Sequence, residues 1–487
     1  MILKSLETHV GSQKHILQFW DELTTDEKEK LSHQIKSIDF EWSRRCFDNS
    51  SKVSPTNSEN FHPVPSLEAI SRNEVAAVVL AGGQASRLGS VAPKGTIPLG
   101  LNVSPVDSLI GIQAAKLALL EKLAAKMYPG TEGKIQWLVM TSKSTEAQTR
   151  LHLDKVIAAT DLSPEQVLVF SQAEIPAFDM DGNLLLENKY TIVTSPIAIL
   201  INDNVENRRH NDVYRRNLDG NGGLFSAIAS HLAKLKVLGV KYFHIYCIDN
   251  ILCKVADPHF LGFVFEKGAD VATKTVMKQP GELVGSVCLD NGKPRVTEYS
   301  ELGSELATRM RDDGRLMFCA GSIANHLYTM EFLERFFYFT PFTYFFADIY
   351  KFYVIYRFCT PSYYLPFHRA LKKISYVNSN GETLKPDVPN GIKLEQFVFD
   401  VFHFSKNFYI WEVEREDEFS PLKNAESIGK DCLSTCKRDL AFLNRKWLIA
   451  AGAKVEKDPV YLKTLSSYNG EGLDHFKDQV VSDTVVA

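Results

Sequence analysis

The sequence predicts an α/β fold with a Rossmann-like, mostly parallel central sheet, an N-terminal helical layer and a small C-terminal domain. Four short apolar runs have the length and composition of buried strands. They are Val75–Leu80 and residues 135–140, 167–170 and 242–247. Helical patterns over residues 108–127 and 224–238 lie between them, and strands that alternate with helices are typical of a parallel sheet.

The run Val75–Leu80 leads directly into Gly82 and Gly83, followed by Arg87 and by Pro93-Lys94. Six apolar residues with several β-branched members indicate a strand buried on both faces. Glycines let a ligand approach the bare backbone, and two cations behind the turn suit phosphoryl oxygens. We interpret this stretch as a phosphate-binding turn. An ordinary strand-turn-helix with incidental cations is the alternative.

Several classes of protein and site are disfavoured by motif and composition. The turn matches neither G-x-x-x-x-G-K-[ST] nor G-x-G-x-x-G, so the common nucleotide-binding loops do not apply. A net charge of −4 in 487 residues disfavours a nucleic-acid or membrane-surface binder. Eight cysteines without C-x-x-C spacing indicate reduced thiols, and no secretory signal is apparent. We therefore expect a cytoplasmic protein without a disulfide framework.

Three further motifs follow along the chain. A glycine-rich stretch at residues 219–223, with Gly220 and Asn221, precedes a helical pattern and allows close backbone approach to a ligand. Asp249 follows the apolar run 242–247, where it is placed either to bind Mg²⁺ or to cap a helix. Lys423 has the charge to reach a phosphate, although a solvated surface lysine is the commoner role for that charge. The apolar run 397–402 has the pattern of a core strand.

The chain divides into three predicted parts. Residues 1–70 form an N-terminal helical segment and linker, with helices over 14–48 and an N-cap at Thr24 or Thr25. Residues 71–430 form the main domain, and residues 431–487 a small C-terminal domain.

The glycine turn and its surroundings resemble a known family. Residues 80–89 with Pro93-Lys94 are similar to the sugar nucleotidyltransferase pattern L-A-G-G-x-G-T-R-L-G followed by P-K. Residues 246–252, 254–258, 267–270 and 417–425 extend the resemblance over nearly the whole chain. The sequence thereby resembles the eukaryotic UDP-sugar pyrophosphorylase family, in its UDP-N-acetylhexosamine branch. This implies the nucleotidyltransferase type of Rossmann-like sheet.

The resemblance implies roles for individual residues. Cations that act on the phosphates would be Arg87, Lys94 and Lys423, and Asp249 would bind Mg²⁺ (or Mn²⁺). Nucleotide-binding residues would be Leu80, Ala81, Gly82, Gly83, Gln172 and Gly220. Sugar-binding residues would be Asn221, Gly285, Glu298, Tyr299, Ser322, Phe397 and Phe399.

The reaction that the resemblance implies joins UTP and N-acetylglucosamine 1-phosphate, giving UDP-N-acetylglucosamine and pyrophosphate. The sugar phosphate would attack the α-phosphorus in line with the departing pyrophosphate. Two alternatives stay open: a preference for another sugar 1-phosphate, and an impaired paralogue that only binds a nucleotide sugar. No nucleic-acid or membrane partner is expected. The oligomeric state, a homodimer included, is open.

Three departures from the family pattern bear on activity. One is a pair of segments without a family counterpart, near 197–218 and 336–364, which are atypical insertions in the catalytic domain, residues 71–430. Ala85 replaces a loop glycine, which would cost about 1 kcal/mol or more if that position requires φ > 0. Ser322 replaces an asparagine in the stretch G-S-I-A-N-H, with an expected loss of about 1–3 kcal/mol if a polar group is left unpaired. Ala85, Ser322 and the insertion beside Asp219 motivate the paralogue alternative.

Overall fold

The computed structural model describes most of the chain. The described residues are 2–10, 14–17, 20–37, 66–101, 107–172, 174–188, 191–196, 224–298, 301–338, 365, 368–378 and 381–486. Three predicted site residues, Gly220, Asn221 and Tyr299, lie outside them, as do the predicted insertion 197–218 and residues 339–364 of the second. The chain falls into two compact units, Met1–Pro63 and Val64–Ala487, and each is described by itself.

The first unit is helical. It contains α1 (Ile2–Val10), α2 (Thr25–Ser37) and two short 3-10 turns, Lys14–Leu17 and Trp20–Glu22. Thr24 caps α2 as predicted: its hydroxyl accepts from the Glu27 N–H, and its own N–H donates to the Glu27 carboxylate at 2.8 Å. Buried Leu6, Val10 and Ile35 form a small core.

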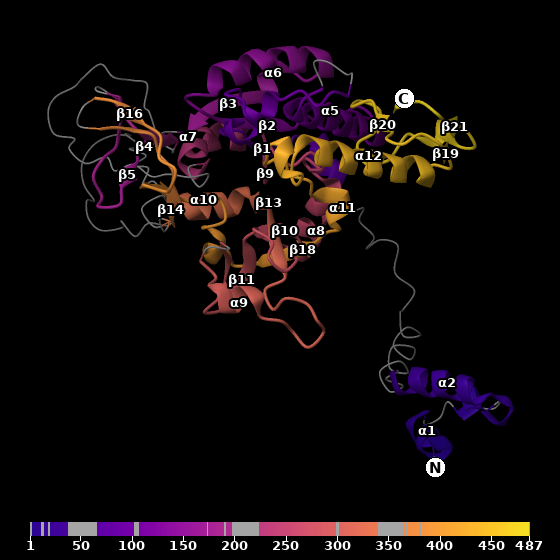
Figure 1. Ribbon diagram of the computed structural model, residues 1–487. Helices are drawn as coiled ribbons and strands as arrows, with labels where there is room; N and C mark the ends of the chain where they lie inside the picture. Colours follow the sequence, from indigo (N-terminus) through magenta and orange to yellow (C-terminus); the bar gives the residue numbers. More distant parts are fainter. Residues whose placement is uncertain are drawn as a thin grey trace, which may run out of the picture. The chain divides into compact units, whose positions relative to one another are not determined.

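The second unit is built on a nine-stranded mixed sheet (Figure 1). Its main path runs β12-β11-β13-β9-β1-β2-β3, and β10 joins both β13 and β18. The four strands β9, β1, β2 and β3 are parallel, whereas β13 is antiparallel to both β9 and β10. The predicted α/β class with a Rossmann-like core is therefore confirmed. The strands of this sheet are β1 (Val75–Leu80), β2 (Gln136–Ser142), β3 (Val167–Gln172), β9 (Tyr242–Cys247), β10 (Val271–Met277), β11 (Ser286–Asp290), β12 (Lys293–Thr297), β13 (Ala320–Thr329) and β18 (Phe408–Glu412).

Helices cover both faces of the sheet. The helices of the second unit are α4 (Ser66–Ser71), α5 (Leu109–Met127), α6 (Glu146–Thr160), α7 (Leu224–Val237), α8 (Pro258–Lys267), α9 (Ser304–Thr308), α10 (Met330–Tyr338), α11 (Arg415–Glu418) and α12 (Leu433–Ala450). Alternate side chains of β1 point to opposite faces, as a strand requires. Val75, Ala77 and Val79 belong to one buried cluster with residues of α5, α6, α8 and α12, and Ala76 and Val78 belong to another with residues of α7 and α10.

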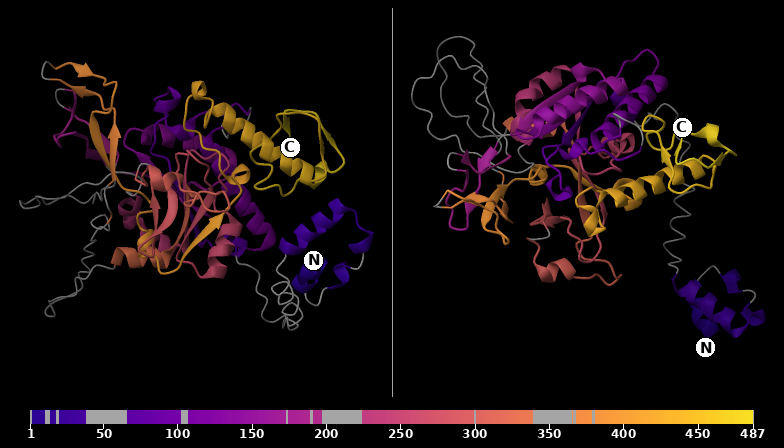
Figure 2. Two further views of the ribbon diagram at one scale, coloured as in Figure 1. Left: turned by 60° about the horizontal axis from the view of Figure 1, so that its bottom comes forward. Right: turned by 45° about the horizontal axis from the view of Figure 1, so that its top comes forward.

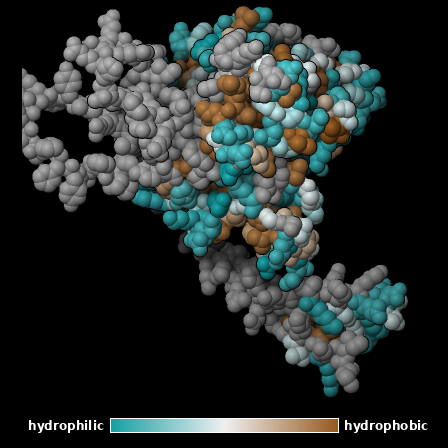
Figure 3. Space-filling view, turned by 60° about the vertical axis from the view of Figure 1, so that its left-hand side comes forward, coloured by the Kyte–Doolittle hydropathy of each residue, from teal (hydrophilic) through white to brown (hydrophobic). Residues whose placement is uncertain are grey.

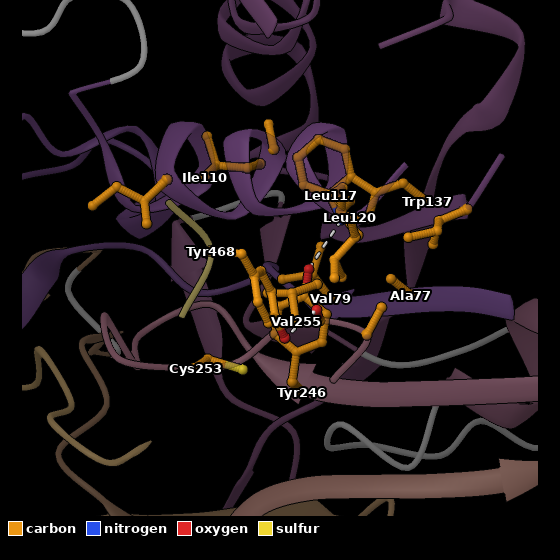
Figure 4. Close-up of a cluster of buried hydrophobic side chains, with 14 of the residues drawn as sticks. Ala77, Val79, Ile110, Leu117, Leu120, Trp137, Tyr246, Cys253, Val255 and Tyr468 are labelled. Carbon is orange, nitrogen blue, oxygen red and sulfur yellow. Dashed lines mark hydrogen bonds between the residues drawn. The ribbon is translucent and has the colours of Figure 1, made fainter. Parts of the chain in front are cut away.

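Two buried hydrogen bonds lie inside the larger core (Figure 4). The Trp137 indole N–H donates to the Tyr246 hydroxyl at 3.1 Å, which joins β2 to β9 across β1. The Tyr468 hydroxyl donates to the Val255 carbonyl at 3.0 Å. Because Tyr468 follows α12, the C-terminal segment is fastened to the same core as the central strands.

Smaller pairings complete the second unit. A three-stranded sheet β14-β17-β5 lies at one end, and Figure 2 shows its orange strands from two further directions. The short strands are β4 (Glu174–Pro176), β5 (Phe178–Asp179), β6 (Leu186–Asn188), β7 (Thr191–Ile192), β8 (Thr194–Pro196), β14 (His368–Lys372), β15 (Tyr376–Val377), β16 (Thr383–Leu384), β17 (Gly391–Glu395), β19 (Lys454–Val455), β20 (Tyr461–Leu462), β21 (Val480–Val481) and β22 (Val485–Val486).

The apolar run 397–402 differs from its predicted strand. Residues 398–401 form turns, and a 3-10 helix follows at Phe402–Phe404. Its predicted burial is confirmed, because Val398, Phe399, Val401 and Phe402 are all in the core. A short, mostly apolar run indicates that a segment is buried but does not determine its backbone conformation.

Exposed apolar side chains form patches among hydrophilic ones on the face drawn in Figure 3. Among the described residues, no helix combines the length and the apolar character that crossing a membrane requires.

Candidate active site

The glycine turn lies at the carboxyl ends of the parallel strands. Leu80 pairs with Met140 on one side and Cys247 on the other, so β1 ends between β2 and β9. Ala81 still donates to the Met140 carbonyl at 2.8 Å, and the chain then leaves the sheet at Gly82 and Gly83. Ligands of such sheets bind at this edge.

Gly82 and Gly83 differ in their surroundings. A Cβ atom on Gly82 would lie 2.7 Å from Gln172 Nε2 and 3.3 Å from the Thr141 carbonyl carbon, so the neighbouring strands leave no room for a side chain. A Cβ on Gly83 would meet nothing within 4 Å. The Gly82 carbonyl accepts from the Ser142 hydroxyl at 2.8 Å, a contact that the sequence did not reveal. The turn is thus anchored at Gly82 and open at Gly83.

Gln172 ends β3 beside this turn. Its side chain is buried, and its Oε1 has no hydrogen-bond partner among the described residues. A buried amide acceptor without a partner is costly unless a ligand or water supplies a donor. The structure therefore brings the predicted nucleotide residues Leu80, Ala81, Gly82, Gly83 and Gln172 together at one edge.

Ala85 is accommodated without backbone strain. Its φ is −83°, in the ordinary region for an L-residue, and its N–H donates to the Ala92 carbonyl at 2.9 Å. The positive φ of this loop occurs four residues later, at Gly89 with φ 77°. The conditional cost expected for alanine at position 85 therefore does not arise.

We expect Ala85→Gly to leave turnover unchanged and to lower the free energy of unfolding by up to about 1 kcal/mol, because glycine frees the unfolded chain. Urea unfolding and initial rates of the variant measure both quantities. A large gain of turnover would instead show that alanine impairs the loop.

Lys94 and Asp249 face each other across the sheet edge. Lys94 begins a short 3-10 turn, and its N–H donates to the Gly83 carbonyl at 3.1 Å. Asp249 follows β9, and its Oδ2 lies 3.8 Å from Lys94 Nζ, with both side chains less than one-fifth exposed. Asp249 lies in a turn after β9. Arg87 is exposed on the same loop as Lys94.

The segment that carries Lys423 is tied to the end of β9. The Leu422 N–H donates to the Asp249 carbonyl at 2.8 Å, and Asn250 bonds the Ser420 N–H and the Glu418 carbonyl. The Lys423 ammonium lies 5.8 Å from the centre of the Phe419 ring. Burial and Asp249 raise the pKa of Cys247 to about 12, and the charges of Lys423 and Lys94 act in the opposite direction. The ion pair of Lys94 with Asp249 and the backbone bond from Leu422 to Asp249 bring Lys94, Asp249 and the segment of Lys423 together.

A second group of predicted residues lies around β11 and β13. A Cβ on Gly285 would come 2.8 Å from Val296 and 3.1 Å from Glu298 Oε1. The Ser322 N–H donates to the Gly285 carbonyl at 2.8 Å, and its buried hydroxyl accepts from the Ala324 N–H at 3.5 Å. Burial, and next the charge of Glu301, raise the pKa of Glu298. The charge of Lys423 acts to lower this pKa, so Lys423 lies within electrostatic range of Glu298.

The aromatic residues of the second group are stacked. The rings of Phe397 and Phe399 lie 4.9 Å apart at an interplanar angle of 21°. His368 lies 4.8 Å from the Phe397 ring, and Lys278 is buried with its ammonium 3.1 Å from the Ser286 hydroxyl. Sequence reasoning missed His368 and Lys278, because neither follows a recognisable motif, and the carboxylate partners of His368 are distant in sequence.

Comparison with known proteins identifies the family. The profile of UTP–glucose-1-phosphate uridylyltransferase (UDPGP) matches residues 28–340. The chain belongs to the UDPGP family. It is 49% identical to a probable UDP-N-acetylglucosamine pyrophosphorylase of Caenorhabditis elegans, over 97% of this chain and 93% of that relative. The UDP-N-acetylglucosamine pyrophosphorylase of Saccharomyces cerevisiae is 34% identical over 96% of each chain.

A solved structure agrees in fold. The crystal structure of a UDP-N-acetylglucosamine pyrophosphorylase assigned in Entamoeba histolytica matches with a TM-score of 0.72 and 30% identity, covering 90% of this chain and 98% of that one. The resemblance to UDP-sugar pyrophosphorylases that the sequence shows is thereby confirmed, and so is the predicted α/β class.

Proposed function

We propose that this chain transfers a uridylyl group from UTP to N-acetylglucosamine 1-phosphate, releasing pyrophosphate and forming UDP-N-acetylglucosamine. The observation that carries the proposal is the meeting of Lys94, Asp249 and the Lys423 segment beside an open glycine turn. The similarity to UDP-N-acetylglucosamine pyrophosphorylases over nearly the full chain supports this choice of substrates.

In the proposed reaction a sugar-phosphate oxygen attacks the α-phosphorus of UTP. The new oxygen–phosphorus bond forms as the bond from the α-phosphorus to the bridging oxygen breaks, and pyrophosphate leaves with the electron pair. Because the attacking phosphate is already anionic, no protein base is required. Lys94, Arg87 and Lys423 would neutralise the phosphates and hold them in line.

Asp249 fits a role in holding Mg²⁺ (or Mn²⁺). Among the described residues, no cluster of three His, Cys, Asp or Glu side chains forms a complete metal cage. Mg²⁺ is usually bound through one or two carboxylates, substrate phosphates and water, and one partly exposed carboxylate beside the turn suits that pattern. The bound ion would supply further positive charge to the phosphate oxygens.

We propose that Gln172 binds the uracil edge of UTP, with its unpartnered Oε1 accepting from the base and its Nε2 donating to it. We expect Gln172→Leu to raise the KM for UTP by about tenfold or more, since roughly 1–3 kcal/mol of polar binding is lost. The KM for the sugar phosphate should change less than twofold.

Unfolding of the same variant separates binding from structure. Because Oε1 has no partner among the described residues, leucine should leave the melting temperature unchanged or raise it. A lowered melting temperature with an unchanged KM for UTP would contradict the assignment.

Gly285, Glu298, Ser322, Phe397 and Phe399 are proposed to bind the sugar. Three residues outside the described part of the chain, Gly220, Asn221 and Tyr299, keep their proposed roles in nucleotide and sugar binding. The cytoplasm is the proposed location, because six described cysteines are free thiols.

Pyrophosphate release tests the proposal. The full-length protein is assayed with UTP and Mg²⁺, and with either N-acetylglucosamine 1-phosphate or glucose 1-phosphate. Clear turnover with the acetylated sugar is expected. Faster turnover with glucose 1-phosphate would indicate another sugar preference, and no turnover by folded protein would favour an impaired paralogue.

A further inference from the structure

We propose that His368 is a positioning residue that fastens together the two turns on the sugar side of the site. One turn carries Glu298 and Glu301, and the other carries Phe397, Phe399 and Asp400. This inference rests on the proposed function, because it assigns those turns to sugar binding.

Both ring nitrogens of His368 contact carboxylates. Nδ1 lies 2.5 Å from Glu301 Oε1, and Nε2 lies 3.1 Å from Asp400 Oδ1. Ionised carboxylates only accept hydrogen bonds, so the two contacts together suit the doubly protonated ring. The imidazolium thus bridges two segments that are 67 and 32 residues away in sequence.

Each carboxylate is itself part of a turn. Asp400 Oδ2 accepts from the Phe397 N–H at 2.6 Å, and the Asp400 N–H returns a bond to the Phe397 carbonyl. On the other side, the Glu301 N–H donates to the Glu298 carbonyl at 2.9 Å. Loss of His368 would free both turns, and with them the Phe397–Phe399 stack and Glu298.

The bridge is well shielded from solvent. The side chain of His368 is 10% exposed and that of Asp400 5%, whereas Glu301 is 33% exposed. Charged hydrogen bonds are stronger in such surroundings than in water. The bridge can therefore hold the turns more firmly than a surface ion pair would.

The charges around His368 are predominantly acidic. Glu301 and Asp400 bond it, Glu298 lies within electrostatic range, and Glu395 pairs with it in the β14–β17 register. Arg295 lies 3.7 Å from Glu301 Oε2, and Lys372 lies 3.5 Å from Glu395. Burial lowers the pKa of His368, but the bonds to Asp400 and Glu301 outweigh it and raise the pKa to about 9.

The sign of the pH dependence follows. The pKa of the folded state is raised above that of the unfolded chain, so the bridge is complete at neutral pH and is lost as pH rises through about 9. A sugar site held by this bridge should weaken over that alkaline interval.

Steady-state kinetics of the full-length protein test the inference. In His368→Gln we expect the KM for N-acetylglucosamine 1-phosphate to rise at least about fivefold, with the KM for UTP unchanged within about twofold. The wild-type KM for the sugar phosphate should rise between pH 8 and pH 10, and this rise should be absent from the variant.

Two further variants keep the test decisive. Glu301→Gln removes one side of the bridge at its most exposed member, and should raise the same KM by a smaller factor if His368→Gln fails to fold. Arg315→Gln removes an exposed cation that pairs with Asp313 and not with the bridge, and should leave both KM values near wild type.

The outcomes separate this inference from the proposed function. Wild-type turnover with an unchanged KM for the sugar phosphate in both bridge variants would overturn the role of His368 alone. Equal increases in both KM values would also overturn it, since a merely structural role would act that way. Absence of wild-type turnover would overturn the proposed function and this inference with it.

Discussion

Lys94→Met should lower kcat/KM at least about a hundredfold while the protein stays folded. A loss of this size is typical when a preorganised protein charge that stabilises the transition state is removed. Lys94 is held at the turn by its own backbone, which bonds the Gly83 carbonyl, and its ammonium faces Asp249 at 3.8 Å. A separation of 3.8 Å is well beyond that of a charged hydrogen bond, so their pairing contributes little to stability. The loss should therefore appear in catalysis.

Initial rates at saturating Mg²⁺ measure this loss, and urea unfolding shows whether stability is retained. Lys126→Met is the control, because Lys126 is an exposed lysine in the last turn of α5. If Lys94→Met kept more than a tenth of wild-type activity, the role given to Lys94 would be refuted.

Lys274→Met should lower the free energy of unfolding by about 3–5 kcal/mol, the cost of leaving a buried charge uncompensated. Lys274 on β10 is 0% exposed, and its ammonium lies 2.5 Å from carboxylate oxygens of both Asp257 and Glu418. Burial alone would lower the pKa of Lys274, yet the two carboxylates raise it. Removal of the lysine leaves two buried carboxylates without the ammonium that lies 2.5 Å from each of them.

Chemical unfolding of Lys274→Met and Lys446→Met provides a matched comparison. Lys446 pairs with Asp417 at 2.7 Å, next in sequence to Glu418, but its side chain is 52% exposed. Its substitution should cost less than about 1 kcal/mol. Equal losses in the two variants would contradict a special contribution from the buried cluster.

The buried cluster also accounts for motifs that the sequence showed only as resemblance. Residues 254–258 and 417–425 are far apart in sequence, yet Asp257 and Glu418 meet at Lys274. Lys254 adds a contact to Glu418 at 3.5 Å. Glu418 of this cluster precedes Leu422, whose N–H bonds the Asp249 carbonyl. The cluster therefore anchors the segment that contacts Asp249.

Local pattern was sufficient where one face or both faces of an element are buried. The predicted strand 242–247 coincides with β9, and the helical pattern 108–127 coincides with α5, capped by Ser108. The glycine turn and its cations were also found, because the chemistry of a phosphate site lies in consecutive residues.

Features that depend on long-range pairing were not predicted. Nothing in the stretch 320–329 indicated that β13 runs antiparallel between β9 and β10, which makes the sheet mixed. The bridge of His368 to Glu301 and Asp400 was not predicted either, because its partners are far apart in sequence and a lone histidine forms no motif. The strain considered at Ala85 was a question of φ, which only the structure answers.

The central claim is transfer of the uridylyl group at the α-phosphorus, and the fate of a labelled phosphorus tests it most directly. UTP labelled at the α-phosphorus is incubated with the full-length protein, Mg²⁺ and N-acetylglucosamine 1-phosphate, and the products are separated. We expect the label in UDP-N-acetylglucosamine, and label placed at the γ-phosphorus in pyrophosphate. Label from the γ-phosphorus in inorganic phosphate, or no sugar nucleotide at all, would contradict the account.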